Sequence, residues 1–374
     1  MNDVWRSRLH QTAAVFRLEI GKTLFSRRGL WIYLLAALPV VLFVMAGIFA
    51  GHRASERASW IASETAARQG QPLTAADFSA LLTGMSEAEV RQRLGPPADF
   101  NTFSFPSRTP QGRRIRVHGL NFYYAVPEAN YEITLLDGKV DAVRNRAAPG
   151  FSELVNVFAT VYQFFMLRLA IFFGCLGIFM NLFRGELLDK SLHFYFLAPI
   201  RREVVLAGKF LAGLAAAGLI FLTSVAVQIV VLGAQLPPPS RAQFLSVQNG
   251  WHQIAAYLAI TLLACAAYGA FFCAAGLFTK NPILPAAILL VWEGINPFLP
   301  ALLKKISIIY YLNALLPTRL NAAPGTPSLL SLLISDPDAL APLWAILGLL
   351  CVAAVLLVLA ARRVRRLELD YTAE

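Results

Sequence analysis

The chain has 374 residues, of which 57% are hydrophobic and 15% are charged, and its formal net charge is +11. Because globular domains carry about 25% charged residues, this composition excludes an ordinary water-soluble protein. The positive charge does not require nucleic acid as a partner, since Lys and Arg beside membrane spans face anionic lipid headgroups.

The N-terminal arm, residues 1–28, has the spacing of an amphipathic helix. Its apolar residues recur every three or four positions at Trp5, Leu9, Ala13, Phe16, Ile20 and Leu24. Next to a membrane span, such a helix is expected to lie in the cytoplasmic interface; packing on a soluble partner is the alternative. The tripeptide Gly21-Lys22-Thr23 is similar to the end of a phosphate-binding loop, but Phe16 stands where that motif needs glycine.

Six apolar segments are long enough to cross a bilayer, which takes about 20 residues. We expect spans at residues 29–50, 155–183, 205–232, 254–278, 283–303 and 340–361. The fifth is the least regular, because Glu293, Asn296 and Pro297 interrupt it. The predicted fold is therefore an all-α membrane protein with six transmembrane helices and an N-terminal interfacial helix.

Basic residues set the orientation, because Lys and Arg collect on cytoplasmic flanks. They are frequent in the arm, in the connection between the second and third spans and in the C-terminal region. This distribution predicts a protein of the plasma (inner) membrane with both termini in the cytoplasm. Three basic residues do not fit this orientation: Lys304, Lys305 and Arg319. The chain then divides into the arm (1–28), the first span (29–51), an extracytoplasmic domain (52–150), a five-span bundle (151–366) and a tail (367–374).

The extracytoplasmic segment has the local signals of a small α+β domain. Thr74 with Asp77 and Ser86 with Glu89 resemble capping boxes that open short helices. Gly95 and the two prolines after it end the second helix. Beyond it, LNFYYAV, NYEITLL and DAVRN are typical of strands, the last two joined by the turn Asp137-Gly138-Lys139.

Residues 82–146 resemble the periplasmic lipoprotein domain of the SmpA/OmlA type. The resemblance rests on Gly84-Met85-Ser86, Val90, Leu94-Gly95-Pro96, Tyr123-Tyr124 and Asp137-Gly138-Lys139. The lipidated cysteine of that family is missing, and the first span would anchor the domain instead. The resemblance implies a small α+β fold and a role in protein contacts. No enzymatic activity follows from it, and no nucleophile–base set is visible in the segment.

The connection at residues 184–204 has charged residues at both ends, aromatic residues between them and a central proline. Pro199 disfavours helical geometry at Ala198, which predicts a helix–break–helix pattern. Gly208, Ala212 and Ala216 follow at four-residue spacing, which allows close packing on a neighbouring helix. Composition alone leaves two interpretations, a loop on the lipid headgroups or a docking element for a soluble partner.

The pattern Phe196-Leu197-Ala198-Pro199-Ile200-Arg201-Arg202, with Gly208-Lys209 after it, resembles the permease subunits of type-2 ABC transporters. The stretch FRLEIGKTLFSRRG is similar to the elbow helix of that family. Asp189-Lys190-Ser191 departs from the usual Gly-Thr. The resemblance implies that the loop docks a separate ATPase through Glu186, Leu187, Asp189, Lys190, Leu192, Phe196, Leu197, Pro199, Arg201 and Arg202.

That resemblance also implies the partners. ATP and Mg²⁺ would be bound by a cytoplasmic P-loop ATPase, and this chain would hold no cofactor and no enzymatic activity of its own. A second permease chain, identical or related, would complete a dimer, and the family predicts an exporter. A membrane scaffold that presents residues 52–150 to envelope-assembly proteins is the competing function. An ion-coupled secondary transporter would require internal repeats that the sequence does not show.

Charged residues inside predicted spans are candidates for function, because they are costly in a bilayer. Arg168 and Glu293 are two such residues. They are expected to approach each other, or to line a pathway together with Asn296. The alternative is that Arg168 reaches the outer interface while Glu293 caps a broken helix. The four cysteines lie inside spans without the spacing of metal ligands, and the five histidines are scattered, so no metal site is predicted.

Overall fold

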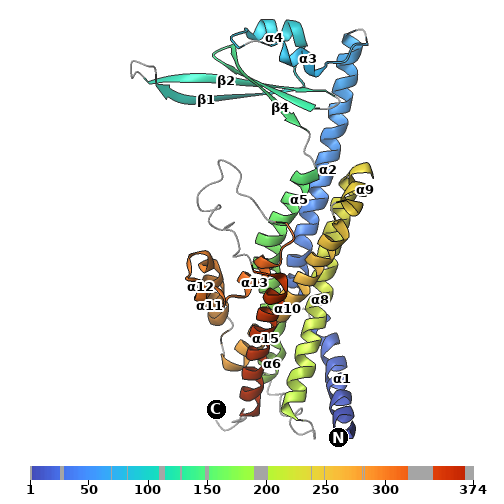
Figure 1. The fold of residues 1–374 in the computed structure, drawn as a ribbon, viewed down its shortest axis with the longest axis vertical. Coiled ribbons are helices and arrows are strands. Elements are labelled where there is room, and N and C mark those ends of the chain that lie inside the picture. The colour runs from blue at the N-terminus through green and yellow to red at the C-terminus, as the bar shows by residue number, and fades with distance from the viewer. Residues whose placement is uncertain are drawn as a thin grey trace. The chain divides into compact units, whose positions relative to one another are not determined.

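The computed structural model describes residues 2–25, 29–68, 70–81, 83–108, 114–126, 129–147, 151–188, 201–236, 238–247, 249–279, 281, 283–318 and 340–366. The chain forms two compact units, one of residues Met1–Val44 and Val155–Glu374, the other of Met45–Leu154. The chain passes from one unit to the other inside two helices, α2 (Leu30–Ala67) and α5 (Phe151–Thr160), both labelled in Figure 1. Each unit is described by itself below.

The first unit is helical. In addition to the start of α2, its longer helices are α1 (Asn2–Leu24), α6 (Phe172–Leu188), α8 (Arg202–Gln235), α10 (Gly250–Phe278) and α15 (Pro342–Arg365). The shorter ones are α5 (Phe151–Thr160), α9 (Pro238–Ser246), α11 (Ile283–Gly294), α12 (Ala301–Lys304) and α13 (Ile308–Ala314). A π-helical segment, Val161–Ile171, joins α5 to α6.

Five helices in the described residues are long and apolar enough to cross a membrane. They cover Leu30–Ala67, Leu154–Leu182, Arg202–Gln235, Gly250–Phe278 and Pro342–Arg365. These five correspond to the first, second, third, fourth and sixth predicted spans. The chain is therefore a multi-helix membrane protein, as its composition predicts.

The predicted fifth span at residues 283–303 is wrong as a single helix. Helix α11 has 12 residues, so it is about 18 Å long, less than the roughly 30 Å of bilayer hydrocarbon. It ends at Gly294, and a 3₁₀ turn, Asn296–Phe298, follows. Pro297 lacks the N–H that would continue the α-helical bonds, and α12 and α13 occupy the region after it.

Helix α10 packs against α6, α8 and α15. Small residues permit the close contacts: a Cβ on Gly276 would lie 3.3 Å from the carbonyl oxygen of Met180 in α6. Near the other end of α10, the hydroxyl of Tyr162 donates to the carbonyl oxygen of Tyr257 at 2.9 Å. The small residues of α10 thus serve packing within the chain.

The second unit contains the end of α2, two short helices and a sheet. The helices are α3 (Ala75–Ser79) and α4 (Glu87–Leu94); the strands are β1 (Asp99–Arg108), β2 (Arg114–Ala125), β3 (Ala129–Leu136) and β4 (Lys139–Ala147). The sheet is antiparallel in the order β1-β2-β3-β4 (Figure 1). A core of buried residues that includes Phe78, Val90, Tyr124 and Ile133 joins the helices to the sheet.

Local signals in this unit are confirmed. Both capping boxes form, with the Thr74 N–H bonded to Asp77 at 2.8 Å and the Ser86 N–H to Glu89 at 2.7 Å. Asp137 and Gly138 have φ values of 48° and 79°, which suits the two-residue turn between β3 and β4. Strand β1 was not predicted, although Phe103, Ser104 and Phe105 carry a short alternating pattern.

The N-terminal arm is helical, as predicted, but the predicted stripe is not its most buried face. Within the predicted stripe, Leu9 is 67% exposed and Ala13 is also exposed, whereas Val15 and Glu19, outside the stripe, are buried at 2% and 4%. The buried face contacts α8. A position in the membrane interface remains a prediction for the exposed apolar face.

Candidate functional site

The predicted docking loop is only partly within the described residues. Asp189, Lys190, Leu192, Phe196, Leu197 and Pro199 lie outside them. Glu186 and Leu187 belong to the last turn of α6. Arg201 precedes the first turn of α8 with an extended backbone, and Arg202 is the first residue of that helix. The structure therefore describes the two helices that flank the loop.

The start of α8 is bonded to the end of α15. The Arg202 guanidinium donates to the carbonyl oxygen of Arg365 at 3.1 Å and approaches that of Val364 at 3.5 Å. These carbonyls lie at the C-terminal end of α15, where a helix dipole favours a positive charge. Glu203 and Arg365 form an ion pair whose side chains are 40% and 63% exposed. Exposed pairs of this kind contribute about 0–1 kcal/mol.

A buried ion pair joins the same part of α8 to α1. The Lys209 ammonium lies 2.9 Å from Oε1 of Glu19, and the two side chains are 0% and 5% exposed. Lys22 approaches the same oxygen at 3.7 Å from the surface. Beside the pair, a Cβ on Gly208 would lie 2.7 Å from Cβ of Val15 and 3.1 Å from the Thr12 carbonyl oxygen.

Sequence reasoning did not find this pair. It placed Gly208 at the head of a small-residue row, and the structure brings that glycine against α1. The available signal was a lysine in the first part of an apolar helix together with a glutamate in the amphipathic arm. The sequence does not indicate that the two residues pair, since 190 positions separate Glu19 from Lys209.

The second cluster surrounds Glu293 in α11. Its carboxylate accepts a hydrogen bond from the Tyr268 hydroxyl of α10 through Oε2. Its Oε1 accepts from the Ile309 N–H in the first turn of α13 at 3.2 Å. Asn296 is 7% exposed, and its amide lies 3.5 Å from the Lys304 carbonyl oxygen. Glu293 thus links α10, α11 and α13.

Arg168 lies in the π-helical segment Val161–Ile171. Its guanidinium stands over the Phe164 ring at 5.4 Å, and its buried Nε has no hydrogen-bond partner. Among the described residues, no ion pair within 4.0 Å joins Arg168 to Glu293. The role of these residues in a pathway stays a prediction.

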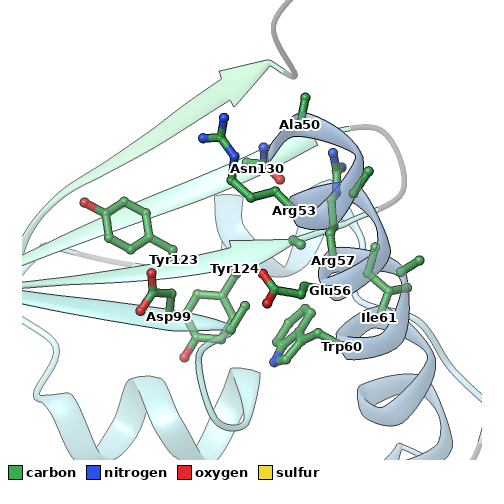
Figure 2. Close-up of a pocket in the computed structure, with 14 residues that line it drawn as sticks. Ala50, Arg53, Glu56, Arg57, Trp60, Ile61, Asp99, Tyr123, Tyr124 and Asn130 are labelled. Carbon is green, nitrogen blue, oxygen red and sulfur yellow. The ribbon is translucent and has the colours of Figure 1, made fainter. Parts of the chain in front are cut away.

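The second unit has a pocket of its own, between α2 and the sheet, with a volume of about 720 Å³. Figure 2 shows Arg53, Glu56 and Trp60 on the α2 side and Asp99 and Tyr123 on the sheet side. Arg57 closes one wall by donating to the carbonyl oxygens of Val126 and Ala129, the latter at 3.2 Å. The lining contains both signs of charge beside aromatic rings, so its charges favour neither anions nor cations.

Five long apolar helices define a multi-pass membrane protein, and a buried polar cluster joins one of them, α10, to α11 and α13. The family model described as ABC-2 family transporter protein matches residues 13–366. The chain therefore belongs to the ABC-2 family of transporter membrane proteins. None of the curated proteins and none of the solved structures matches it. The resemblance of residues 82–146 to SmpA/OmlA domains stays an interpretation of the sequence.

Proposed function

We propose that this chain is the permease subunit of an ATP-driven exporter and that its loop at residues 184–204 docks a separate P-loop ATPase. The family assignment supports a transport subunit, and ABC-2 permeases normally work with an ATPase partner. The chain itself then binds no nucleotide; ATP and Mg²⁺ belong to the partner. A second permease chain, identical or related, completes the transporter in the plasma membrane with both termini in the cytoplasm.

One observation carries the proposal: the helix that follows the loop is fastened on two sides. Arg202 at its start binds the end of α15, and Lys209, seven residues later, binds α1. Seven residues correspond to about 10 Å of helix, so both attachments lie within two turns of the loop. A force applied to the loop would move three packed helices rather than one free end.

The test is affinity purification of the tagged chain from its native membrane in mild detergent, followed by mass spectrometry. We expect a P-loop ATPase at near-equal stoichiometry. Replacing Phe196, Pro199 and Arg201 by alanine should remove it from a chain that still elutes as a folded protein. Arg241→Ala is the control, because Arg241 lies in α9, beyond the opposite end of α8 from the docking loop. Retention of the ATPase by the triple variant would contradict the docking proposal.

A scaffold that presents the second unit to envelope proteins is the second candidate, and the pocket beside Arg53 and Tyr123 is the observation that favours it. The same purification separates the two functions. Recovery of envelope-assembly proteins without an ATPase, and their loss on Arg53→Ala with Tyr123→Ala, would support the scaffold. Their retention in that double variant would argue against the pocket as the contact.

A further inference from the structure

The contact between α1 and the first part of α8 combines a charged and a close-packed component. Lys209 is fully buried, and its ammonium is 2.9 Å from the Glu19 carboxylate, itself buried. One position earlier, Gly208 brings the backbone of α8 against Val15 and the Thr12 carbonyl. Buried charges are strongly destabilising once one partner is removed, because the other charge is left uncompensated.

The position of Lys209 makes this contact more than a local anchor. Lys209 lies on α8, which packs against both α1 and α10. The exposed pair of Glu203 and Arg365 lies six residues earlier on α8 and joins α15 instead. The two ion pairs thus differ in burial and in the helix that they join to α8, and only the buried pair is expected to govern how α8 and α1 move together.

We propose that Glu19 and Lys209 are positioning residues that hold α1 and the first part of α8 as one rigid body behind the docking loop. This inference rests on the proposed function, since the body has a role in coupling only if an ATPase acts on residues 184–204. Removing either charge should separate the helices without removing the loop. The ATPase should then still bind to the permease, but the complex should lose most of its ATP hydrolysis.

The first test reports on the ion pair and needs no ATPase. Val15, 2% exposed, is replaced by cysteine in a full chain whose four natural cysteines are alanine, and its labelling by a water-soluble maleimide is timed in detergent. We expect Glu19→Gln or Lys209→Met to raise the labelling rate by about tenfold or more. The double variant Glu19→Gln/Lys209→Met should label more slowly than either single variant, because it removes both buried charges together.

The control is Glu203→Gln, which removes the exposed pair on the same helix and should change the rate by less than about twofold. Unchanged protection of Val15→Cys in both single variants would overturn the proposal. Additive effects in the double variant would also overturn it, since they would mean that each side chain contributes packing volume rather than a paired charge.

The second test uses the complex with its ATPase. We expect Lys209→Met to retain the ATPase on purification and to lose most of its ATP hydrolysis, with Arg241→Ala, which lies outside the docking loop, close to the unsubstituted chain. During turnover, Val15→Cys should stay protected when Glu19 and Lys209 are intact; reactivity that appears only with ATP would overturn the rigid-body proposal. If the unsubstituted chain brings down no ATPase, the proposed function fails, and the labelling series alone decides whether the pair holds α1 to α8.

Discussion

Gly208 of α8 and Val15 of α1 lie so close that a Cβ on the glycine would come within 2.7 Å of Cβ of the valine. The two helices therefore meet backbone against side chain. Because no flexible side-chain end can simply swing away from this contact, the position has room for glycine alone. The contact lies next to the buried ion pair of Glu19 and Lys209.

Gly208→Leu should destabilise the chain. A larger side chain in a packed interface costs about 1–3 kcal/mol and displaces one helix from the other. The measurement is the thermal unfolding midpoint in detergent, obtained from the folded fraction that fluorescence-detected size-exclusion chromatography records after heating. Gly233→Leu on the same helix is the control, because no atom lies within 4 Å of the Cβ it would add. Equal midpoints for the two variants would contradict the prediction.

Glu293→Ala should be more harmful than Tyr268→Phe. The alanine variant leaves both the Tyr268 hydroxyl and the buried Ile309 N–H without their acceptor. Each buried group that loses its partner costs about 1–3 kcal/mol. Tyr268→Phe removes one of the two donors and keeps the bond to α13. The unfolding midpoints of the two single variants and of the double variant measure the energetic coupling between Tyr268 and Glu293. A Tyr268→Phe effect as large as that of Glu293→Ala would contradict this ranking.

Gly95→Ala should weaken the second unit. Gly95 has a φ of 80°, and an added Cβ would lie 2.3 Å from Oε1 of Glu64. With ψ at −167°, this backbone conformation is essentially restricted to glycine and alone costs about 1–3 kcal/mol for alanine. Gly84→Ala is a matched control for that cost, because Gly84 has a φ of 96° and nothing within 4 Å of the added atom.

The opening free energy of the β2 and β3 amides, from hydrogen exchange of the full chain, measures both variants. Gly95→Ala should lower that free energy more than Gly84→Ala does, since only the first also displaces Glu64. Tyr124 contacts the same glycine: its hydroxyl donates to the Gly95 carbonyl oxygen at 2.9 Å. Burial raises the pKa of the Tyr124 hydroxyl above its usual value. Tyr124→Phe should cost about 1 kcal/mol.

The first turn of α4 should loosen in acid. Hydrogen bonds from Ser86 lower the pKa of Glu89 below its ordinary 4.5. A carboxyl whose pKa is lower in the folded state contributes stability that is present above the unfolded pKa and lost as the pH falls through the folded one. The exchange protection of the Glu89 amide should therefore fall below about pH 4.5 in the natural chain.

Glu89→Gln should remove that pH dependence, because glutamine does not titrate. Glu87→Gln is the control, as Glu87 forms an exposed pair with Arg91 on the same helix. A pH profile that is the same in the Glu89→Gln variant and in the natural chain would contradict the assignment to Glu89.

Much of the local structure could be predicted from the sequence. Apolar runs longer than about 20 residues must cross a bilayer or lie buried, so five of the spans follow from composition. The capping boxes of α3 and α4 and the turn at Asp137 and Gly138 depend on residues within three positions of each other. Such signals are readable because donor and acceptor are neighbours along the chain.

Contacts between distant residues were decided only by the tertiary structure. The face that α1 buries, at Val15 and Glu19, depends on where α8 presents Gly208 and Lys209. The break after Gly294 could be suspected from Pro297, but the bond from Ile309 to Glu293 requires the chain to fold back. Periodicity records which side of a helix is apolar, and it holds no information on which partner will satisfy a buried charge.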